Sequence, residues 1–178
     1  MNYNDFLSLC EKRRSIRYFE RKPVEKDDVL KLLELARLAP SVENTQPWHF
    51  HVVMNKKLIE ELKKTSCYGD FIQGAGVFII VTCDHSVQAC TPMPVWNEHE
   101  LELSCMSAVE NMLLGVTSMG LGGCFVSLHH GPVHQLLSLP HHEKIVGAIM
   151  VGHYAAGEER LFDARDRKPL EEMYTFHE

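Results

Sequence analysis

A basic segment close to the N-terminus has the residue types that bind phosphate. Residues 12–22, KRRSIRYFERK, hold six basic residues and one acid, although the chain as a whole carries a formal net charge of −6. Arginine guanidinium groups pair with phosphate oxygens in a bidentate way, and a serine hydroxyl adds a further donor. The alternative is a solvated basic surface, which is the usual role of a charge run. With a second basic cluster near the C-terminus, the candidate phosphate ligands are Arg13, Arg14, Ser15, Arg17, Arg165 and Arg167.

Two further segments could contact a flat heteroaromatic ligand. Residues 39–50, APSVENTQPWHF, offer short polar side chains with apolar backing from proline and tryptophan. Residues 120–127, GLGGCFVS, follow a helix pattern and open a strand pattern, the reverse of a Rossmann or P-loop arrangement. Their glycines could instead let backbone N–H groups approach a flat ring closely. The alternatives are an ordinary helix-to-strand connection for the first segment, and a helix C-cap with a tight turn for the second.

The composition and the absent motifs exclude several classes of protein. A chain of 178 residues that is 45% hydrophobic and 24% charged is typical of one globular domain, which we expect to span residues 1–178. The negative charge argues against nucleic acid and anionic membranes as partners. No signal peptide or spanning segment is recognisable, so a cytoplasmic location is expected. No GxSxG, P-loop or recognisable Ser/His/Asp set occurs.

Eleven histidines and six cysteines raise the question of a metal site. His49 and His51 alternate along an expected strand, which puts both on one face. However, no CxxC pair, HExxH pattern or zinc-finger spacing is present, so no metal site is expected. The cysteines are expected to be mostly buried free thiols, and a His/Cys metal-binding protein is kept as an alternative.

Hydrophobic periodicity predicts an irregular alternation of helices and strands. Helices are expected over residues 4–14 (with Asn4 or Asp5 near the N-cap), 24–39, 55–64, 101–119 and 132–138. Strands are expected over residues 48–54, 76–83, 124–128 and 144–152. The continuous apolar run 76–83 is typical of a central strand covered on both faces. The irregular order favours an α+β fold over a series of βαβ units.

The helix expected over residues 101–119 is apolar on nearly all sides. Its main stripe consists of Leu101, Cys105, Ala108, Met112, Val116 and Met119. Other faces add Leu103, Met106, Leu113 and Leu114. A helix that is apolar nearly all round must be covered nearly all round. Either a partner subunit covers it, which we favour, or it is the central helix of a monomer.

Three motifs, in this order, resemble those of the nitroreductase family of flavoproteins. They are RRSIRYF (13–19), APSVENTQPWHF (39–50) and the long apolar helix that ends in GLGGC (120–124). VGHYA (151–155) and RKPLEE (167–172) resemble the family's late strand and C-terminal motif, so the resemblance covers nearly the whole chain. It implies an α+β fold with a central, mostly antiparallel sheet flanked by helices. It also implies a homodimer with FMN at the subunit interface.

The FMN ligands that the resemblance implies fall into three groups. The phosphate, ribityl or pyrimidine end would be bound by Arg13, Arg14, Ser15 and Arg17, with Arg165 and Arg167 completing the phosphate site. The opposite subunit would contribute Pro40, Ser41, Val42 and Asn44 to the flavin ring and ribityl chain. The backbone near flavin N5 would be that of Phe125, Val126 and Ser127.

The implied activity is that of an FMN-dependent oxidoreductase. Hydride would pass from NADH or NADPH through flavin N5 to a nitroaromatic, a quinone or a similar small-molecule acceptor, with no side chain as acid or base. One open flavin face would have to serve both donor and acceptor, which predicts ping-pong kinetics. The segment between Cys83 and Glu98 is short for the family, which predicts a more open substrate pocket. The alternatives are a flavin-binding or flavin-handling module without NAD(P)H turnover, and a relative with dehalogenase or dehydrogenase activity.

Overall fold

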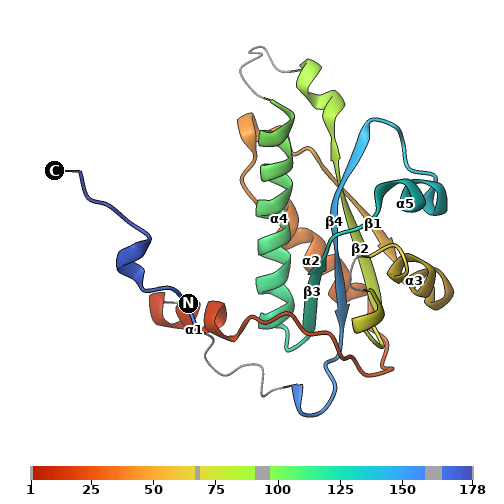
Figure 1. The fold of residues 1–178 in the computed structure, drawn as a ribbon, viewed down its shortest axis with the longest axis horizontal. Helices are drawn as coiled ribbons and strands as arrows, with labels where there is room; N and C mark the ends of the chain where they lie inside the picture. The colour runs from red at the N-terminus through yellow and green to blue at the C-terminus, as the bar shows by residue number, and fades with distance from the viewer. Residues whose placement is uncertain (1, 67–68, 91–96, 159–165, 178) are drawn as a thin grey trace.

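The computed structural model describes residues 2–66, 69–90, 97–158 and 166–177, which build a four-stranded sheet with helices on both faces (Figure 1). The strands are β1 (Trp48–Val53), β2 (Val77–Asp84), β3 (Gly122–Val126) and β4 (Glu143–Gly152). They lie in the order β1-β2-β4-β3, and each neighbouring pair is antiparallel. The expected α+β class with an antiparallel sheet is therefore confirmed.

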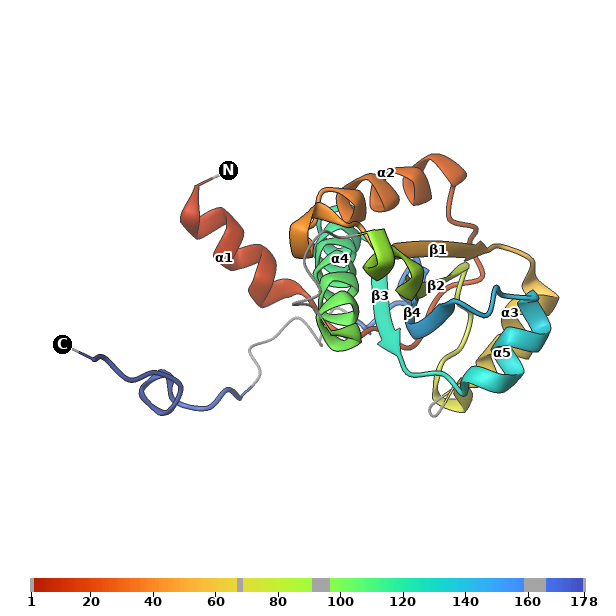
Figure 2. The same ribbon diagram turned by 90° about the horizontal axis from the view of Figure 1, so that it is seen from above.

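Two apolar cores lie on opposite faces of the sheet, because the side chains of β2 alternate between them. Val77, Ile79 and Val81 pack against helices α2 (Lys26–Arg37) and α4 (Glu98–Ser118). Phe78 and Ile80 pack against helices α3 (Lys56–Lys63) and α5 (His130–Leu137), on the other side of the sheet (Figure 2). All of β2 up to residue 83 is buried, so the prediction of a central strand covered on both faces is confirmed.

Helix α4 begins at a capping box and lies along the sheet. The Asn97 side chain accepts a hydrogen bond from the Glu100 N–H, and the Glu100 carboxylate accepts one from the Asn97 N–H. The predicted stripe is buried from Leu101 to Val116. On another face, however, the side chains of Leu103 and Met106 remain 51% and 37% exposed in the single chain.

Both ends of the chain extend away from the sheet (Figures 1 and 2). Helix α1 (Tyr3–Lys12) has no buried residue, although Tyr3, Phe6 and Leu7 are large and apolar. The C-terminal residues 166–177 likewise expose apolar side chains, those of Leu170, Met173, Tyr174 and Phe176. None of the described helices is both long enough and apolar enough to span a bilayer.

The structure corrects several predicted boundaries. Helix α1 begins at Tyr3, because its N-cap is Asn2, which forms a capping box with Asp5, and not Asn4 or Asp5 as expected. Helix α2 is shorter than 24–39, with its N-cap at Glu25 and its C-cap at Leu38. Strand β3 starts at Gly122 and ends at Val126, and helix α5 starts at His130. The predicted Asn55 cap of α3 is confirmed by hydrogen bonds to two backbone N–H groups.

Candidate functional site

The basic segment after α1 lies directly against the glycine-rich strand β3. Ser15 forms a parallel bridge with Gly123, and the Ile16 N–H donates to the Gly123 carbonyl at 2.9 Å. On its other side, the Arg17 carbonyl accepts from the Gln73 N–H at 2.9 Å. The structure thus brings together two of the three segments that the sequence singled out.

A cavity of about 260 Å³ opens where these segments meet. It is lined by Arg17, Tyr18, Phe71, Ile72, Cys124, Phe125 and Val126. Arg17, Phe125 and Val126 were predicted as site residues, whereas Tyr18, Phe71, Ile72 and Cys124 were missed. The only sequence signal for Tyr18 and Cys124 was their position inside the two motifs. Ser127, the last predicted residue of this strand, is exposed just beyond it.

The polar side of this cavity carries the charge of Arg17. The side chain of Arg17 is exposed, and its Nη1 donates to the Ser15 carbonyl at 3.2 Å. Burial raises the pKa of the Cys124 thiol, while the nearby Arg17 charge and a hydrogen bond with Ser15 act in the opposite direction. The cavity therefore combines one guanidinium with an otherwise apolar and neutral lining, which suits an anionic aromatic ligand.

The other two predicted arginines of the segment are held by α1 and α4. The Nη1 of Arg14, whose residue is only 7% exposed, donates to the backbone carbonyls of Glu11 and Arg13. Arg13 caps the end of α1, and its Nε lies 3.8 Å from a carboxylate oxygen of Glu110. Both arginines thus hold the turn between the end of α1 and Arg17, which lines the cavity.

Close packing between Gly122 and Ile16 makes this junction sensitive to any added side chain. A Cβ at position 122 would lie 2.8 Å from the Ile16 Cγ2, which is inside van der Waals contact. We expect Gly122→Ala to lower the free energy of unfolding by about 1–3 kcal/mol, the usual cost of overpacking. Chemical denaturation of both proteins would measure this difference in the free energy of unfolding. The matched control is Gly131→Ala in α5, where nothing lies within 4 Å, and its stability should be unchanged or slightly raised.

The third segment, the polar loop after α2, adopts a strained backbone. Glu43, Asn44 and Gln46 have φ values of 46°, 56° and 49°, in the left-handed region that costs most side chains about 1–2 kcal/mol. Hydrogen bonds offset this cost: the Gln46 N–H donates to the Ser41 Oγ at 3.0 Å, and the Thr45 hydroxyl donates to the Val42 carbonyl at 2.8 Å. Strain maintained in this way is characteristic of ligand-binding loops.

Within one chain the loop does not reach the cavity. The Val42 N–H donates to the Ser104 Oγ, on the second turn of α4, at 3.1 Å. The cavity is instead lined by Cys124, Phe125 and Val126 of β3, the strand that follows the opposite end of this 21-residue helix. A helix of this length spans about 30 Å. Pro40 and Asn44 are exposed, and Ser41 and Val42 are half-buried. None of these four predicted site residues lines the cavity of its own chain.

Of the predicted C-terminal arginines, Arg167 does not line the cavity of its own chain. Arg167 is exposed on the tail that extends away from the sheet, and Arg165 lies outside the described residues. The shortened 84–97 segment is described only in part, as a 3-10 helix over His85–Cys90. The predictions for Arg165 and for a more open pocket therefore remain predictions.

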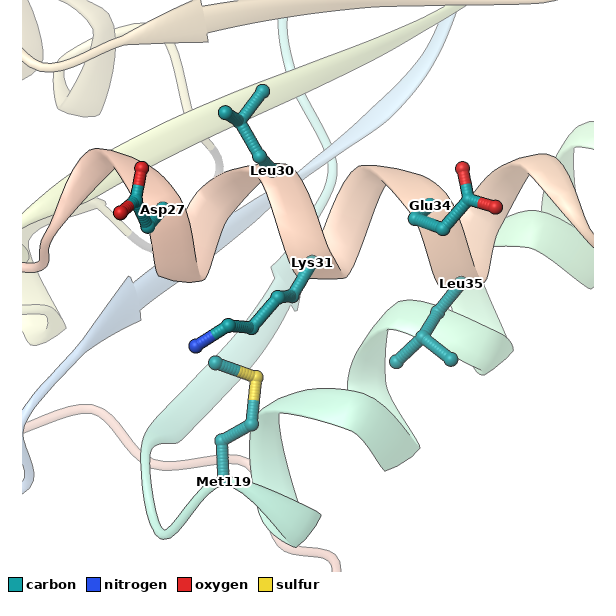
Figure 3. A pocket seen from close by; sticks show the side chains of 6 residues that line it. All are labelled: Asp27, Leu30, Lys31, Glu34, Leu35 and Met119. Carbon is teal, nitrogen blue, oxygen red and sulfur yellow. The ribbon is translucent and has the colours of Figure 1, made fainter.

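A larger groove, of about 610 Å³, lies between α2 and the end of α4, and it lacks comparable chemistry (Figure 3). The side chains of Lys31, Leu35 and Met119 point into the space between the two helices (Figure 3). The Lys31 amino group is already paired with Asp28 at 2.9 Å, which raises its pKa. The groove contains neither a glycine-rich backbone nor an arginine, so the cavity at β3 is the stronger candidate site.

Comparison with known proteins agrees with the motifs and the fold. Residues 10–67 and 64–153 match the family model described as "Nitroreductase family". A relative from Methanothermobacter thermautotrophicus, provisionally named NADH dehydrogenase/NAD(P)H nitroreductase, is 32% identical over 94% of this chain and 87% of its own length. This α+β protein with a cavity between an arginine segment and a glycine-rich strand therefore belongs to the nitroreductase family.

Two further similarities are to proteins whose names give a ligand or a reaction. A provisionally named nitroreductase from Desulfovibrio desulfuricans, solved in complex with FMN, is 27% identical. Its TM-score is 0.81, and the match covers 99% of both chains. Human iodotyrosine deiodinase 1 is 28% identical over 95% of this chain and 67% of its own length.

Proposed function

We propose that the protein is an FMN-dependent oxidoreductase that uses NADH or NADPH to reduce a nitroaromatic, a quinone or a similar small acceptor. The observation that carries this proposal is the cavity that is lined both by Arg17 and by Cys124, Phe125 and Val126 of β3. Membership of the nitroreductase family and the FMN complex of the 27% identical relative support the choice of ligand.

The residues around the cavity fit FMN chemically. Arg17 supplies a charged donor for a phosphate or a pyrimidine oxygen, and Arg13 lies in the same turn. The apolar side chains of Phe125 and Val126 suit one face of a flat ring. FMN bound here would supply hydride transfer through N5, while these residues bind it, orient it and exclude water from its buried face.

The other face of the site is best completed by a second copy of the chain. The strained loop 40–44 carries amide and hydroxyl groups but is held by the first half of α4 and does not line the cavity of its own chain. The apolar side chains of Leu103 and Met106 on α4 are exposed in the single chain and would be stabilised by burial against another surface. A homodimer would satisfy both, because the partner's loop would approach the flavin while the helices bury their apolar faces.

The proposal also defines the order in which the two substrates bind. One flavin face would be packed on β3, so the nicotinamide and the acceptor would have to use the same open face in turn. The oxidised nicotinamide would then leave before the acceptor binds. Steady-state rates at several concentrations of both substrates should give parallel double-reciprocal lines, whereas intersecting lines would contradict a single shared face.

The direct test of the ligand is the flavin content of the purified protein. We expect the visible spectrum of bound flavin, and one FMN per chain when the cofactor is released and quantified. Sedimentation of the same sample should give a particle of two chains. A colourless protein that takes up no FMN would contradict the proposal.

A halogenated phenol is the second candidate acceptor, because iodotyrosine deiodinase 1 resembles nearly the whole chain. Assays with iodotyrosine and with a nitroaromatic, under the same anaerobic conditions, separate the two reactions. Release of iodide at a rate well above that of nitro reduction would favour dehalogenation. A protein that binds FMN but accepts no hydride from either nicotinamide would instead be a flavin-handling module.

A further inference from the structure

A second set of polar side chains gathers on the face of the sheet that carries α3 and α5. His49 and His51 project from the edge strand β1, and Glu143 lies at the start of β4. One ligand atom from each of the three residues lies within 4.8 Å of the other two. The His51 Nε2 is 2.7 Å from a Glu143 carboxylate oxygen, and the two imidazole centroids are 4.6 Å apart.

The carboxylate in this set is buried and hydrogen-bonded. Glu143 is only 7% exposed, and the Thr82 hydroxyl donates to its Oε2 at 2.6 Å. Burial raises the pKa of Glu143, but the hydrogen bonds from Thr82 and His51 outweigh this effect and hold the pKa below its usual value. A buried carboxylate beside two imidazoles is the nitrogen and oxygen ligand set that Zn²⁺ prefers.

We propose that His49, His51 and Glu143 form a zinc site with an open fourth position. The exposure of His49 leaves that position accessible to water. Thr82 would not touch the ion, but its hydrogen bond to the Glu143 carboxylate would hold that carboxylate in position to bind it. This proposal departs from the sequence-based expectation of no metal site, which rested on ligand spacing along the chain.

The present distances require only small side-chain movements to admit the ion. Ligands at about 2.0–2.2 Å from a tetrahedral Zn²⁺ lie about 3.3–3.5 Å from one another. The His51 Nε2 and the Glu143 oxygen, now 2.7 Å apart, would move slightly apart. Any pair of ligand atoms near the 4.8 Å limit would move closer together. As it becomes a ligand, the His51 Nε2 would exchange its hydrogen bond with the Glu143 carboxylate for a bond to the metal.

The proposed zinc site is separate from the flavin cavity. Glu143 lies five positions before Ala148, which is the partner of Val126 at the edge of the cavity. At about 3.3 Å per residue, this places the two sites about 16 Å apart along β4. Zinc binding and FMN binding can therefore be measured independently.

The test is a titration of the FMN-loaded, chelator-treated full-length protein with Zn²⁺, read by calorimetry and elemental analysis. We expect one tightly bound zinc per chain. His49→Gln should weaken binding at least 100-fold, and because His49 is exposed this variant should fold normally. Glu143→Gln should also weaken zinc binding at least 100-fold. Thr82→Val should lower the zinc affinity by about 10- to 100-fold, as loss of a residue that positions a metal ligand does.

The matched control is His99→Gln, which removes an exposed histidine from the first turn of α4. Its zinc affinity and FMN content should equal those of the unmodified protein. Zinc should also raise the unfolding temperature of the unmodified protein but not that of His49→Gln. Weak binding without a fixed stoichiometry, or equal affinity in the unmodified protein and His49→Gln, would overturn the proposal.

Discussion

Replacing Arg17 by alanine is expected to weaken FMN binding by about 10- to 150-fold. A hydrogen bond to a charged group is worth about 1.5–3 kcal/mol, and Arg17 is the charged residue that lines the β3 cavity. Because the Arg17 side chain is exposed, its loss should leave the fold intact. Quenching of FMN fluorescence during titration measures the dissociation constant directly.

Arg21→Ala is the matched control for this experiment. Arg21 belongs to the same basic segment and is exposed, but it does not line the β3 cavity. Its substitution should leave the affinity for FMN nearly unchanged. Arg167→Ala, in the tail, is expected to cost as much as Arg17→Ala if the tail of one chain completes the phosphate site. If Arg17→Ala and Arg167→Ala both bind FMN as tightly as the unmodified protein does, the two basic clusters are solvated surfaces.

Leu103→Glu is expected to convert the protein into a monomer that retains little FMN. The side chain of Leu103 is 51% exposed on α4, in the surface assigned to the partner subunit. Burying a carboxylate there without a partner charge would cost several kcal/mol, which is enough to dissociate a typical dimer. Sedimentation and flavin content would be measured on the same sample.

The control for the dimer prediction lies on the opposite side of the sheet. Leu136, on α5, is 41% exposed and far from the proposed interface, so Leu136→Glu should remain dimeric and yellow. A Leu103→Glu protein that is still dimeric would show that another surface forms the interface. An unmodified protein that is monomeric with bound FMN would refute the shared site.

The elements that could be predicted from sequence are those with strong local patterns. The apolar run of β2 and the long stripe of α4 are both buried as expected, because burial follows directly from such periodicity. Helix boundaries were less accurate. The start of α1 depends on two reciprocal hydrogen bonds between Asn2 and Asp5, and Asn2 lies outside the range predicted for this helix.

The sites were harder to predict, because they depend on contacts between distant parts of the chain. Phe71 and Ile72 enter the cavity only because residues 71–73 run beside Arg17. The contact between His51 and Glu143 joins residues 92 positions apart. It requires the register of β2 and β4, including the irregularity at Val81 and Thr82, which no local spacing encodes.

The central claim, that the bound flavin accepts hydride from a nicotinamide, is tested most directly by anaerobic mixing. The FMN-loaded protein would be mixed with NADH or with NADPH, without any acceptor, while the visible flavin absorbance is recorded. We expect the absorbance to be lost with at least one of the two donors and to return when a nitroaromatic is added. Flavin absorbance that stays unchanged with both donors would contradict the account.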